Sequence, residues 1–359
     1  MRPWRAIVVV GLGRASEGIT ATVARTGGWR RVGSRRHFRF VDARGRRISD
    51  AEKLERIQRL AIPPAWKEGW ISPRPTAKLQ ATGLDAAGRR QYIYHEDYRA
   101  AQEEAKFDKL VRFADALPAF REAMSEHIEL EPMSPEWTCA VAVRLINLGW
   151  FRVGDDRYTK AHKTFGITTL RKGHVRVRGS RIAFRFRGKH RVWVRTAVVD
   201  SELAGAMRTL LETPGRRLLR YRLDEETYNL SARRLNDYIA AFMGEEFTAK
   251  DFRTWGGTLI AAVALAERGP AETETEAKRA VAAVMRTVGE RLGNTPAVAR
   301  ASYVSPAVVE QYFDGRTIDD FRPRHLRVVR ARETGLELEE QALVSLLRSW
   351  RIRRARKAA

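Results

Sequence analysis

The chain has 359 residues, which is long enough for two or three domains with a sizeable hydrophobic core. Lys and Arg number 67 against 43 Asp and Glu, so the formal net charge is +24 at pH 7, which favours a polyanionic partner such as nucleic acid. Cys139 is the only cysteine, which excludes an internal disulfide and a cysteine-based zinc site.

The chain begins with a short apolar run, AIVVVGLG at residues 6–13. This run is too short to span a bilayer, and Arg14 and Glu17 follow it without a clean signal-peptide cleavage site, so we expect a cytoplasmic protein. Residues 1–20 are interpreted as an N-terminal extension of unknown role. The sequence has no Walker-type GKS or GKT and no histidine spacing typical of a metal site, so we expect neither a cofactor nor a metal.

The next part of the chain predicts a small antiparallel β domain. Residues 28–47 carry eight arginines and a single acid, and HFRFVD within them alternates as a strand does. A brief helix is expected over residues 50–62, where Pro63-Pro64 stops it. Three more strand-like pieces follow with turn signals between them: GWISP (69–73), KLQATGLD (78–85) and RRQYIYH (89–95).

From about residue 98 the apolar residues recur at helical spacing, through residues 104–124 and 137–150. Residues 171–196 return to a period of two and contain ten Lys or Arg and no acid. This pattern predicts three strands joined by turns at Gly179 and Gly188, with the arginines facing outward. The residues expected to face a core are Val175, Val177, Phe184 and Phe186. A basic sheet of this kind is suited to a phosphate backbone.

Helices are predicted again in the C-terminal third. One helix is predicted over residues 226–244, ETYNLSARRLNDYIAAFMG, and Gly244 is expected to end it. A second is expected over residues 270–293, with an apolar stripe formed by Ala277, Val281, Val284, Val288 and Leu292. A last helix covers residues 336–350. The basic run RIRRARKAA (351–359) is interpreted as a disordered tail that touches nucleic acid, or alternatively as a plain solvated end.

Four short segments combine residue types that suit chemistry on phosphate: FRVGDDRYTK (151–160), RGKHRV (187–192), KDFRTWGG (250–257) and GNTPAVARASY (293–303). Together they resemble the active-site segments of type IB DNA topoisomerases, in particular the compact poxvirus-like and bacterial branch. PPAW (63–66), KLQATGLDAAGRRQYIYH (78–95) and TFGITTLRKGHV (164–175) extend the resemblance, which covers about residues 25–315.

The resemblance implies an isomerase that relaxes supercoiled DNA without ATP or metal. One strand would be cleaved through a 3′-phosphotyrosine intermediate, allowed to rotate, and religated. Tyr303 would be the nucleophile, and a phosphotyrosine keeps the bond energy needed for resealing. Arg152 and Arg253 would bind the scissile phosphate, because a guanidinium binds two oxygens at once and stays charged.

Two further catalytic roles follow from the resemblance. Lys189 would protonate the leaving 5′ oxygen as general acid, with Lys172 as the rival candidate. Asn294 stands where poxviral and eukaryotic relatives carry histidine, although bacterial members often have asparagine there. An amide donates a hydrogen bond but cannot shuttle protons, so we expect an electrostatic role.

The family pattern also implies DNA contacts by Gln91, Tyr92, Tyr94, Tyr158 and Lys160. Tyr92 and Tyr94 alternate on one strand and so share a face, although packing in a core is an equal alternative for them. The expected partner is double-stranded DNA in the nucleoid. The enzyme would act as a monomer whose two lobes close around the duplex.

The predicted fold class is α+β. A small antiparallel β domain (21–97) precedes a larger, mostly helical catalytic domain (98–325) with a three-stranded basic sheet, and a helical then basic tail covers 326–359. A tyrosine recombinase is the nearest alternative, but it usually has His-x-x-Arg where this chain has Lys250-Asp251-Phe252-Arg253, and its N-terminal arm is helical. A non-catalytic DNA-binding architectural protein would explain the charge but not the set of site residues.

Overall fold

The structure is a computed structural model that describes residues 27–34, 37–86, 88–322 and 335–358. The predicted extension at residues 1–20 lies outside the described residues. The chain forms two compact units that divide between Ala105 and Lys106. This division lies within the long helix α3 (Glu96–Ile128), as does the boundary predicted between residues 97 and 98. Within the described residues, no helix has both the length and the apolar character that crossing a membrane requires.

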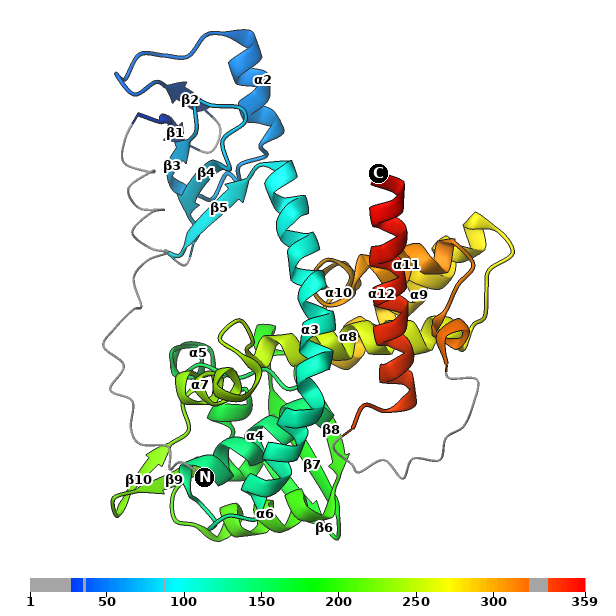
Figure 1. The fold of residues 1–359 in the computed structure, drawn as a ribbon. Coiled ribbons are helices and arrows are strands. Elements are labelled where there is room, and N and C mark those ends of the chain that lie inside the picture. Colours follow the sequence, from blue (N-terminus) through cyan, green and yellow to red (C-terminus); the bar gives the residue numbers. More distant parts are fainter. Residues whose placement is uncertain (1–26, 35–36, 87, 323–334, 359) are drawn as a thin grey trace. The chain divides into compact units, whose positions relative to one another are not determined.

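The N-terminal unit is built on a five-stranded antiparallel sheet in the order β2-β1-β3-β4-β5 (Figure 1). Its strands are β1 (Trp29–Ser34), β2 (His37–Val41), β3 (Lys67–Ile71), β4 (Leu79–Leu84) and β5 (Arg90–Tyr94). Helix α2 (Ala51–Arg59) begins at Asp50, whose carboxylate accepts a hydrogen bond from the Lys53 amide. Ile57 of this helix joins Trp29 and Ile71 in a small core. The predicted β-rich N-terminal domain is confirmed.

The second unit is mostly helical and surrounds one large core. Besides the part of α3 that follows residue 105, its helices are α4 (Pro135–Gly149), α5 (Asp156–His162), α6 (Ser201–Glu212), α7 (Ala232–Met243), α8 (Ala249–Ala266), α9 (Glu274–Leu292), α10 (Pro296–Tyr303), α11 (Pro306–Phe313) and α12 (Leu338–Ala358). Short 3₁₀ turns lie at η1 (Ile167–Thr169), η2 (Lys172–His174), η3 (Lys189–Arg191) and η4 (Ile318–Phe321). The predicted stripe of α9 is buried at every position.

The predicted basic sheet is also confirmed. Strands β6 (Val175–Arg178), β7 (Arg181–Arg187) and β8 (Trp193–Val199) form an antiparallel sheet in that order. Val175 pairs with Phe184 in register, and both are buried, as is Phe186, while Val177 is half-buried. Exposed arginines occupy the opposite face, because successive side chains of a strand point to opposite sides.

Two predictions in the C-terminal third are wrong. Residues 226–229 form strand β10 (Glu226–Asn229), which pairs with β9 (Arg220–Leu223), instead of the first turn of a helix. Asp224 and Glu225 both adopt left-handed backbone angles, which make the tight turn between these strands. Helix α7 starts only at Ala232, after Ser231 accepts a hydrogen bond from the Arg234 amide.

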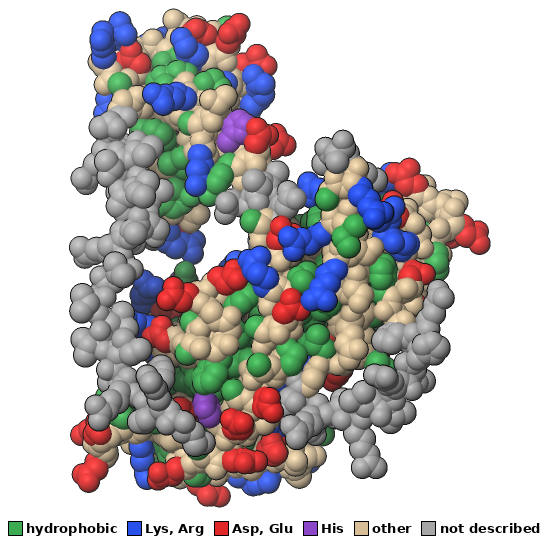
Figure 2. Space-filling model, in the orientation of Figure 1, with side chains coloured by type: hydrophobic (Ala, Val, Ile, Leu, Met, Phe, Trp, Pro, Cys, Tyr) green, Lys and Arg blue, Asp and Glu red, His purple; other side chains and the backbone are tan. Residues whose placement is uncertain are grey.

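The second error concerns the basic C-terminal run. Helix α12 continues through it to Ala358, so the predicted disordered tail is helical. Its arginines pair with acidic side chains of the same unit: Arg348 with Asp115, Arg351 with Asp108, and Arg353 with Asp314. Figure 2 shows basic side chains gathered on this part of the unit with carboxylates beside them. Two arginines of the basic run, Arg351 and Arg353, are therefore paired within the unit.

Candidate active site

Tyr303 is the last residue of α10, a helix that begins with a Thr295 cap followed by a proline. The Thr295 hydroxyl accepts a hydrogen bond from the Val298 amide, and Pro296 occupies the first helical position. At the other end of α10, Thr258 of α8 is fully buried and its hydroxyl lies 3.1 Å from the Tyr303 carbonyl oxygen and 3.1 Å from the Ser305 amide. These contacts fix the backbone on both sides of the Tyr303 side chain, which is half-buried.

A glycine allows α8 and α10 to approach each other at this point. A Cβ atom at Gly257 would lie 2.7 Å from the carbonyl oxygen and 2.9 Å from the Cβ of Tyr303. Glycine in a helix interior normally costs about 0.5–1 kcal/mol relative to alanine. Here the close approach of the two helices explains why that cost is accepted.

Arg253 lies on α8 and is only 4% exposed. Its guanidinium donates to the carbonyl oxygens of Trp150 and Leu292, the latter at 2.8 Å. The guanidinium carbon is 5.0 Å from the centre of the Tyr303 ring, so the two side chains are in contact. The Nε of Arg253 is buried and finds no partner among the described residues.

Arg152 reaches the same place from the loop between α4 and α5. Its Nη2 donates to the Gly293 carbonyl at 2.9 Å and to the Asn294 Oδ1 at 2.6 Å. The pairing needs the left-handed turn at Gly293, which ends α9 and presents that carbonyl. Asn294 is thereby held against Arg152, and its own amide nitrogen lies 3.4 Å from the Leu292 carbonyl.

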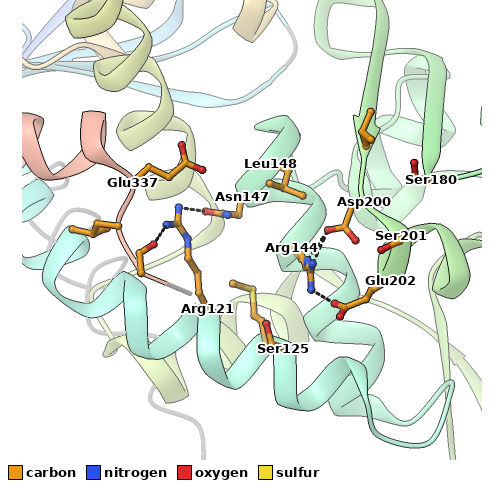
Figure 3. Close-up of a pocket in the computed structure, with 14 residues that line it drawn as sticks. Arg121, Ser125, Arg144, Asn147, Leu148, Ser180, Asp200, Ser201, Glu202 and Glu337 are labelled. Carbon is orange, nitrogen blue, oxygen red and sulfur yellow. Dashed lines mark hydrogen bonds and ion pairs between the residues drawn. The ribbon is translucent and has the colours of Figure 1, made fainter. Parts of the chain in front are cut away.

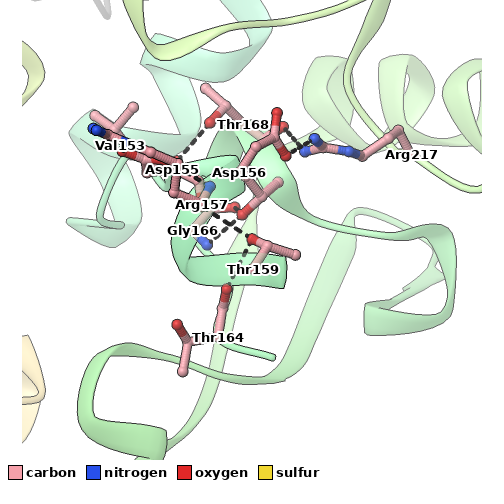
Figure 4. A network of polar contacts seen from close by, with 10 residues as sticks. Val153, Asp155, Asp156, Arg157, Thr159, Thr164, Gly166, Thr168 and Arg217 are labelled. Carbon is pink, nitrogen blue, oxygen red and sulfur yellow. Dashed lines mark hydrogen bonds and ion pairs between the residues drawn. The ribbon is translucent and has the colours of Figure 1, made fainter. Parts of the chain in front are cut away.

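The loop that carries Arg152 is fixed by a network of polar contacts (Figure 4). The Ile167 amide donates to the Arg152 carbonyl at 2.7 Å, and Thr168 donates to the Val153 carbonyl through both its amide and its hydroxyl. At the start of α5, Asp155 caps the helix and Asp156 pairs with Arg217. The backbone of Arg152 is therefore positioned before any ligand arrives.

The two guanidinium groups lie together without a carboxylate. Among the described residues neither Arg152 nor Arg253 forms an ion pair, and each donates instead to neutral carbonyl or amide oxygens. Burial, followed by the charge of Arg152, lowers the pKa of Arg253 to about 10, so Arg253 still carries its charge at neutral pH. Such a pair is suited to an anion that offers two or more oxygens.

The surrounding charges act on the Tyr303 phenol. Burial alone would raise its pKa, but Arg253, Arg152 and Lys250 together bring the pKa below its ordinary value. In the sequence, Lys250 stands where recombinases usually have a histidine. Its position three residues before Arg253 places both side chains on one face of α8, and this spacing is the sequence signal that indicates a place for Lys250 at the site.

Lys189 belongs to a loop that borders the cavity beside Arg152 and Arg253. It is exposed in η3, the connection between β7 and β8, and the structure shows no contact between Lys189 and the other four predicted catalytic residues. The neighbouring residues Gly188 and Val192 line a cavity of about 450 Å³ together with Arg152 and Arg253. The rival Lys172 donates to the Leu211 carbonyl at 2.9 Å and lines a different cavity.

The predicted DNA-contact residues fall on both units. In the N-terminal unit Tyr92 is 39% exposed and its ring centre is 6.1 Å from that of Tyr94, whereas Gln91 donates to Asp85 at 2.9 Å. In the second unit Tyr158 and Lys160 are both exposed on α5. No group of three or more histidines, cysteines or acids among the described residues is arranged to hold a metal ion.

A tyrosine with a lowered phenol pKa lies beside two arginines that no described carboxylate pairs with, and this arrangement is suited to phosphoryl transfer on a polyanion. Comparison with known proteins gives the family. Residues 95–317 match the model of the eukaryotic DNA topoisomerase I catalytic core, and residues 37–85 match that of the bacterial DNA topoisomerase IB N-terminal domain. The five predicted catalytic residues all lie within the first match.

Viral topoisomerases are similar to this chain over most of its length. DNA topoisomerase 1B of Acanthamoeba polyphaga mimivirus is 32% identical over 268 residues, which are 72% of this chain and 80% of the relative. DNA topoisomerase 1B of vaccinia virus (strain Copenhagen) is 23% identical over 282 residues, 75% of this chain and 85% of the relative. The chain belongs to the type IB DNA topoisomerase family and is therefore an isomerase that acts on DNA.

The Tyr303 pKa can be tested directly. We expect Arg253→Gln to raise the pKa of the Tyr303 phenol toward its ordinary value near 10, because the nearest positive charge is lost. NMR titration with tyrosine labelled at Cζ measures this shift. Arg286→Gln, which removes an exposed charge from α9, is the matched control and should leave the resonance unchanged. An equal Tyr303 pKa in wild type and Arg253→Gln would contradict the assigned contact.

The helix contact at Gly257 gives a second prediction. Gly257→Ala should lower plasmid relaxation about 100-fold, because its Cβ would displace Tyr303 from its position. Gly205→Ala on α6 is the control, since a Cβ there meets no other atom within 4 Å. Relaxation by Gly257→Ala at the wild-type rate would show that the close approach has no influence on the site.

Proposed function

We propose that this enzyme relaxes supercoiled DNA by cleaving one strand through Tyr303, letting it rotate, and resealing it without ATP or metal. This proposal rests on one observation: among the residues that the structure describes, Arg152 and Arg253 donate to carbonyl and amide oxygens and to no carboxylate, beside the Tyr303 phenol. A phosphodiester group is the anion that the site would receive from DNA.

In the cleavage step the Tyr303 oxygen attacks the scissile phosphorus. A bond forms between the phenolic oxygen and phosphorus while the bond from phosphorus to the 5′ oxygen breaks. The phenol loses its proton, and its lowered pKa supports attack at neutral pH. The leaving 5′ oxygen gains a proton, which we assign to Lys189 because its loop borders the cavity beside the two arginines.

The arginines supply most of the electrostatic stabilisation in this scheme. Negative charge builds on the non-bridging oxygens in the transition state, and two fixed guanidiniums stabilise it without reorganising. Asn294 would turn its amide nitrogen from the long contact with Leu292 toward one of these oxygens. Religation is the reverse reaction, in which the 5′ hydroxyl attacks the phosphotyrosine.

The remaining predicted contacts would hold the duplex. Tyr158 and Lys160 are exposed on the helix that follows the Arg152 loop, so they are available to the DNA flanking the cleaved phosphate. Tyr92 and Tyr94 would add contacts from the N-terminal unit. We propose that the enzyme works as a monomer and that both units grip one duplex.

Plasmid relaxation tests the proposal. The wild-type enzyme should relax a supercoiled plasmid in EDTA without ATP, and Tyr303→Phe should not, because it lacks the attacking oxygen. Tyr312→Phe is the matched control: this neighbouring tyrosine is buried and its hydroxyl donates to the Gly269 carbonyl at 3.0 Å, so the variant should retain relaxation. Relaxation by Tyr303→Phe, or a wild-type requirement for magnesium and ATP, would refute the mechanism.

A further inference from the structure

Helix α12 places a buried carboxylate in the interior of the second unit. Glu340 is 4% exposed and accepts hydrogen bonds from Arg121 at 2.8 and 2.9 Å, from the indole Nε1 of Trp255 at 3.0 Å, and from the Glu337 amide at 3.0 Å. A carboxylate has about four acceptor positions, and here four donors use them. A buried charge with this many fixed partners defines the position of each partner closely.

Arg121 joins α3 and α4 to the same network. Its guanidinium donates to the Gly335 carbonyl at 2.8 Å and lies 3.4 Å from the Asn147 Oδ1. Figure 3 shows Arg121 reaching toward Asn147 at the wall of a cavity of about 760 Å³. Because Arg121 is itself held by two helices, Glu340 is fixed in the unit independently of α8.

Trp255 connects this network to the active site. It follows Arg253 by two residues on α8, is 3% exposed, and packs against Phe113 with ring centres 6.1 Å apart. Two other side chains hold α8: Asp251 pairs with Lys109 at 2.8 Å, and Thr258 contacts the Tyr303 carbonyl. Arg253 therefore lies between an anchor at residue 251 and anchors at residues 255 and 258.

Helix α12 lies beyond the region in which the topoisomerase core model matches, since that match ends at residue 317. It is nevertheless part of the same core. Leu343, Leu346 and Leu347 are each at most 3% exposed, and the helix packs on α8 and α11. Its position is thus determined by extensive packing, so it can serve as a fixed support for α8.

We propose that Glu340 is a positioning residue which, through its hydrogen bond to Trp255, holds α8 so that Arg253 is placed against Tyr303 and the scissile phosphate. This inference rests on the proposed function of Arg253. It assigns an active-site role to the C-terminal helix, which the motifs around the tyrosine do not include.

A positioning role and a purely structural role have different consequences. A structural role lowers thermal stability alone. A displaced Arg253 also changes the charge around the Tyr303 phenol, which faces Arg253, Arg152 and Lys250. With Arg253 further away, the phenol pKa rises, so cleavage falls most at neutral pH and recovers as the pH increases. The pH profile of cleavage therefore separates the two roles.

The test uses the full-length enzyme and a suicide DNA duplex whose cleavage is irreversible. Trp255→Phe keeps an aromatic ring but removes the N–H donor, and Glu340→Gln keeps the shape of the side chain but removes its charge. We expect each to lower the single-turnover cleavage rate about tenfold at neutral pH, to shift the pH midpoint upward, and to change the DNA Kd by less than about twofold. Trp255→Phe keeps the test valid where Glu340→Gln fails to fold.

Two controls accompany these variants. Arg348→Ala removes an exposed ion pair between α12 and Asp115 of α3 and should leave cleavage unchanged. Met207→Ala leaves a cavity at a fully buried position on α6. It should lower the Tm, so it shows what a loss of stability alone does to cleavage. The inference is overturned if Trp255→Phe lowers the Tm but keeps the wild-type rate and pH profile, or if Met207→Ala reproduces the same shift. A different result would refute the proposed function itself, namely cleavage of the duplex by Tyr303→Phe.

Discussion

Two guanidinium groups that have no carboxylate partner in the described part of the chain are the constraint around which the catalytic unit is built. Placing Arg152 and Arg253 together costs Coulomb energy and desolvation, and the fold offsets this cost with carbonyl oxygens from Trp150, Leu292 and Gly293. Carbonyls orient the arginines without neutralising them. The positive charge remains available for a phosphate, and it also lowers the pKa of the neighbouring Tyr303.

The helices around this pair follow from the same requirement. Helix α8 is apolar on nearly all sides, so it is buried and cannot shift without disturbing the core. Gly257 and Thr258 bring the end of α10 against it, and the turn at Gly293 supplies both a carbonyl and Asn294 for Arg152. A rigid scaffold of this kind places the acceptor groups before DNA binds, which is how electrostatic stabilisation becomes effective.

Much of this arrangement could be predicted from the sequence, because its signals are local. The alternation around Phe184 and the stripe of α9 both specify burial directly, and Thr295-Pro296 specifies where α10 begins. The two errors have different causes. Residues 226–229 directly precede a helical segment but pair with β9 across a two-residue turn, whereas the arginines of α12 pair with acids far away in the sequence. No sequence pattern indicates the carbonyl partners of Arg253, because Leu292 and Trp150 are 39 and 103 residues away from it. The same holds for the contact between Trp255 and Glu340, which are 85 residues apart.

The most direct measurement is to identify the amino acid to which DNA becomes attached. The enzyme is reacted with a suicide duplex, denatured and digested with trypsin, and the nucleotide-bearing peptide is sequenced by mass spectrometry. Trypsin releases residues 301–316 as one peptide that contains both Tyr303 and Tyr312, so fragmentation distinguishes the two. We expect a 3′-phosphate linked to Tyr303. A nucleotide on Tyr312, on any other residue, or linked through a 5′-phosphate would rule out Tyr303 as the nucleophile of the proposed reaction.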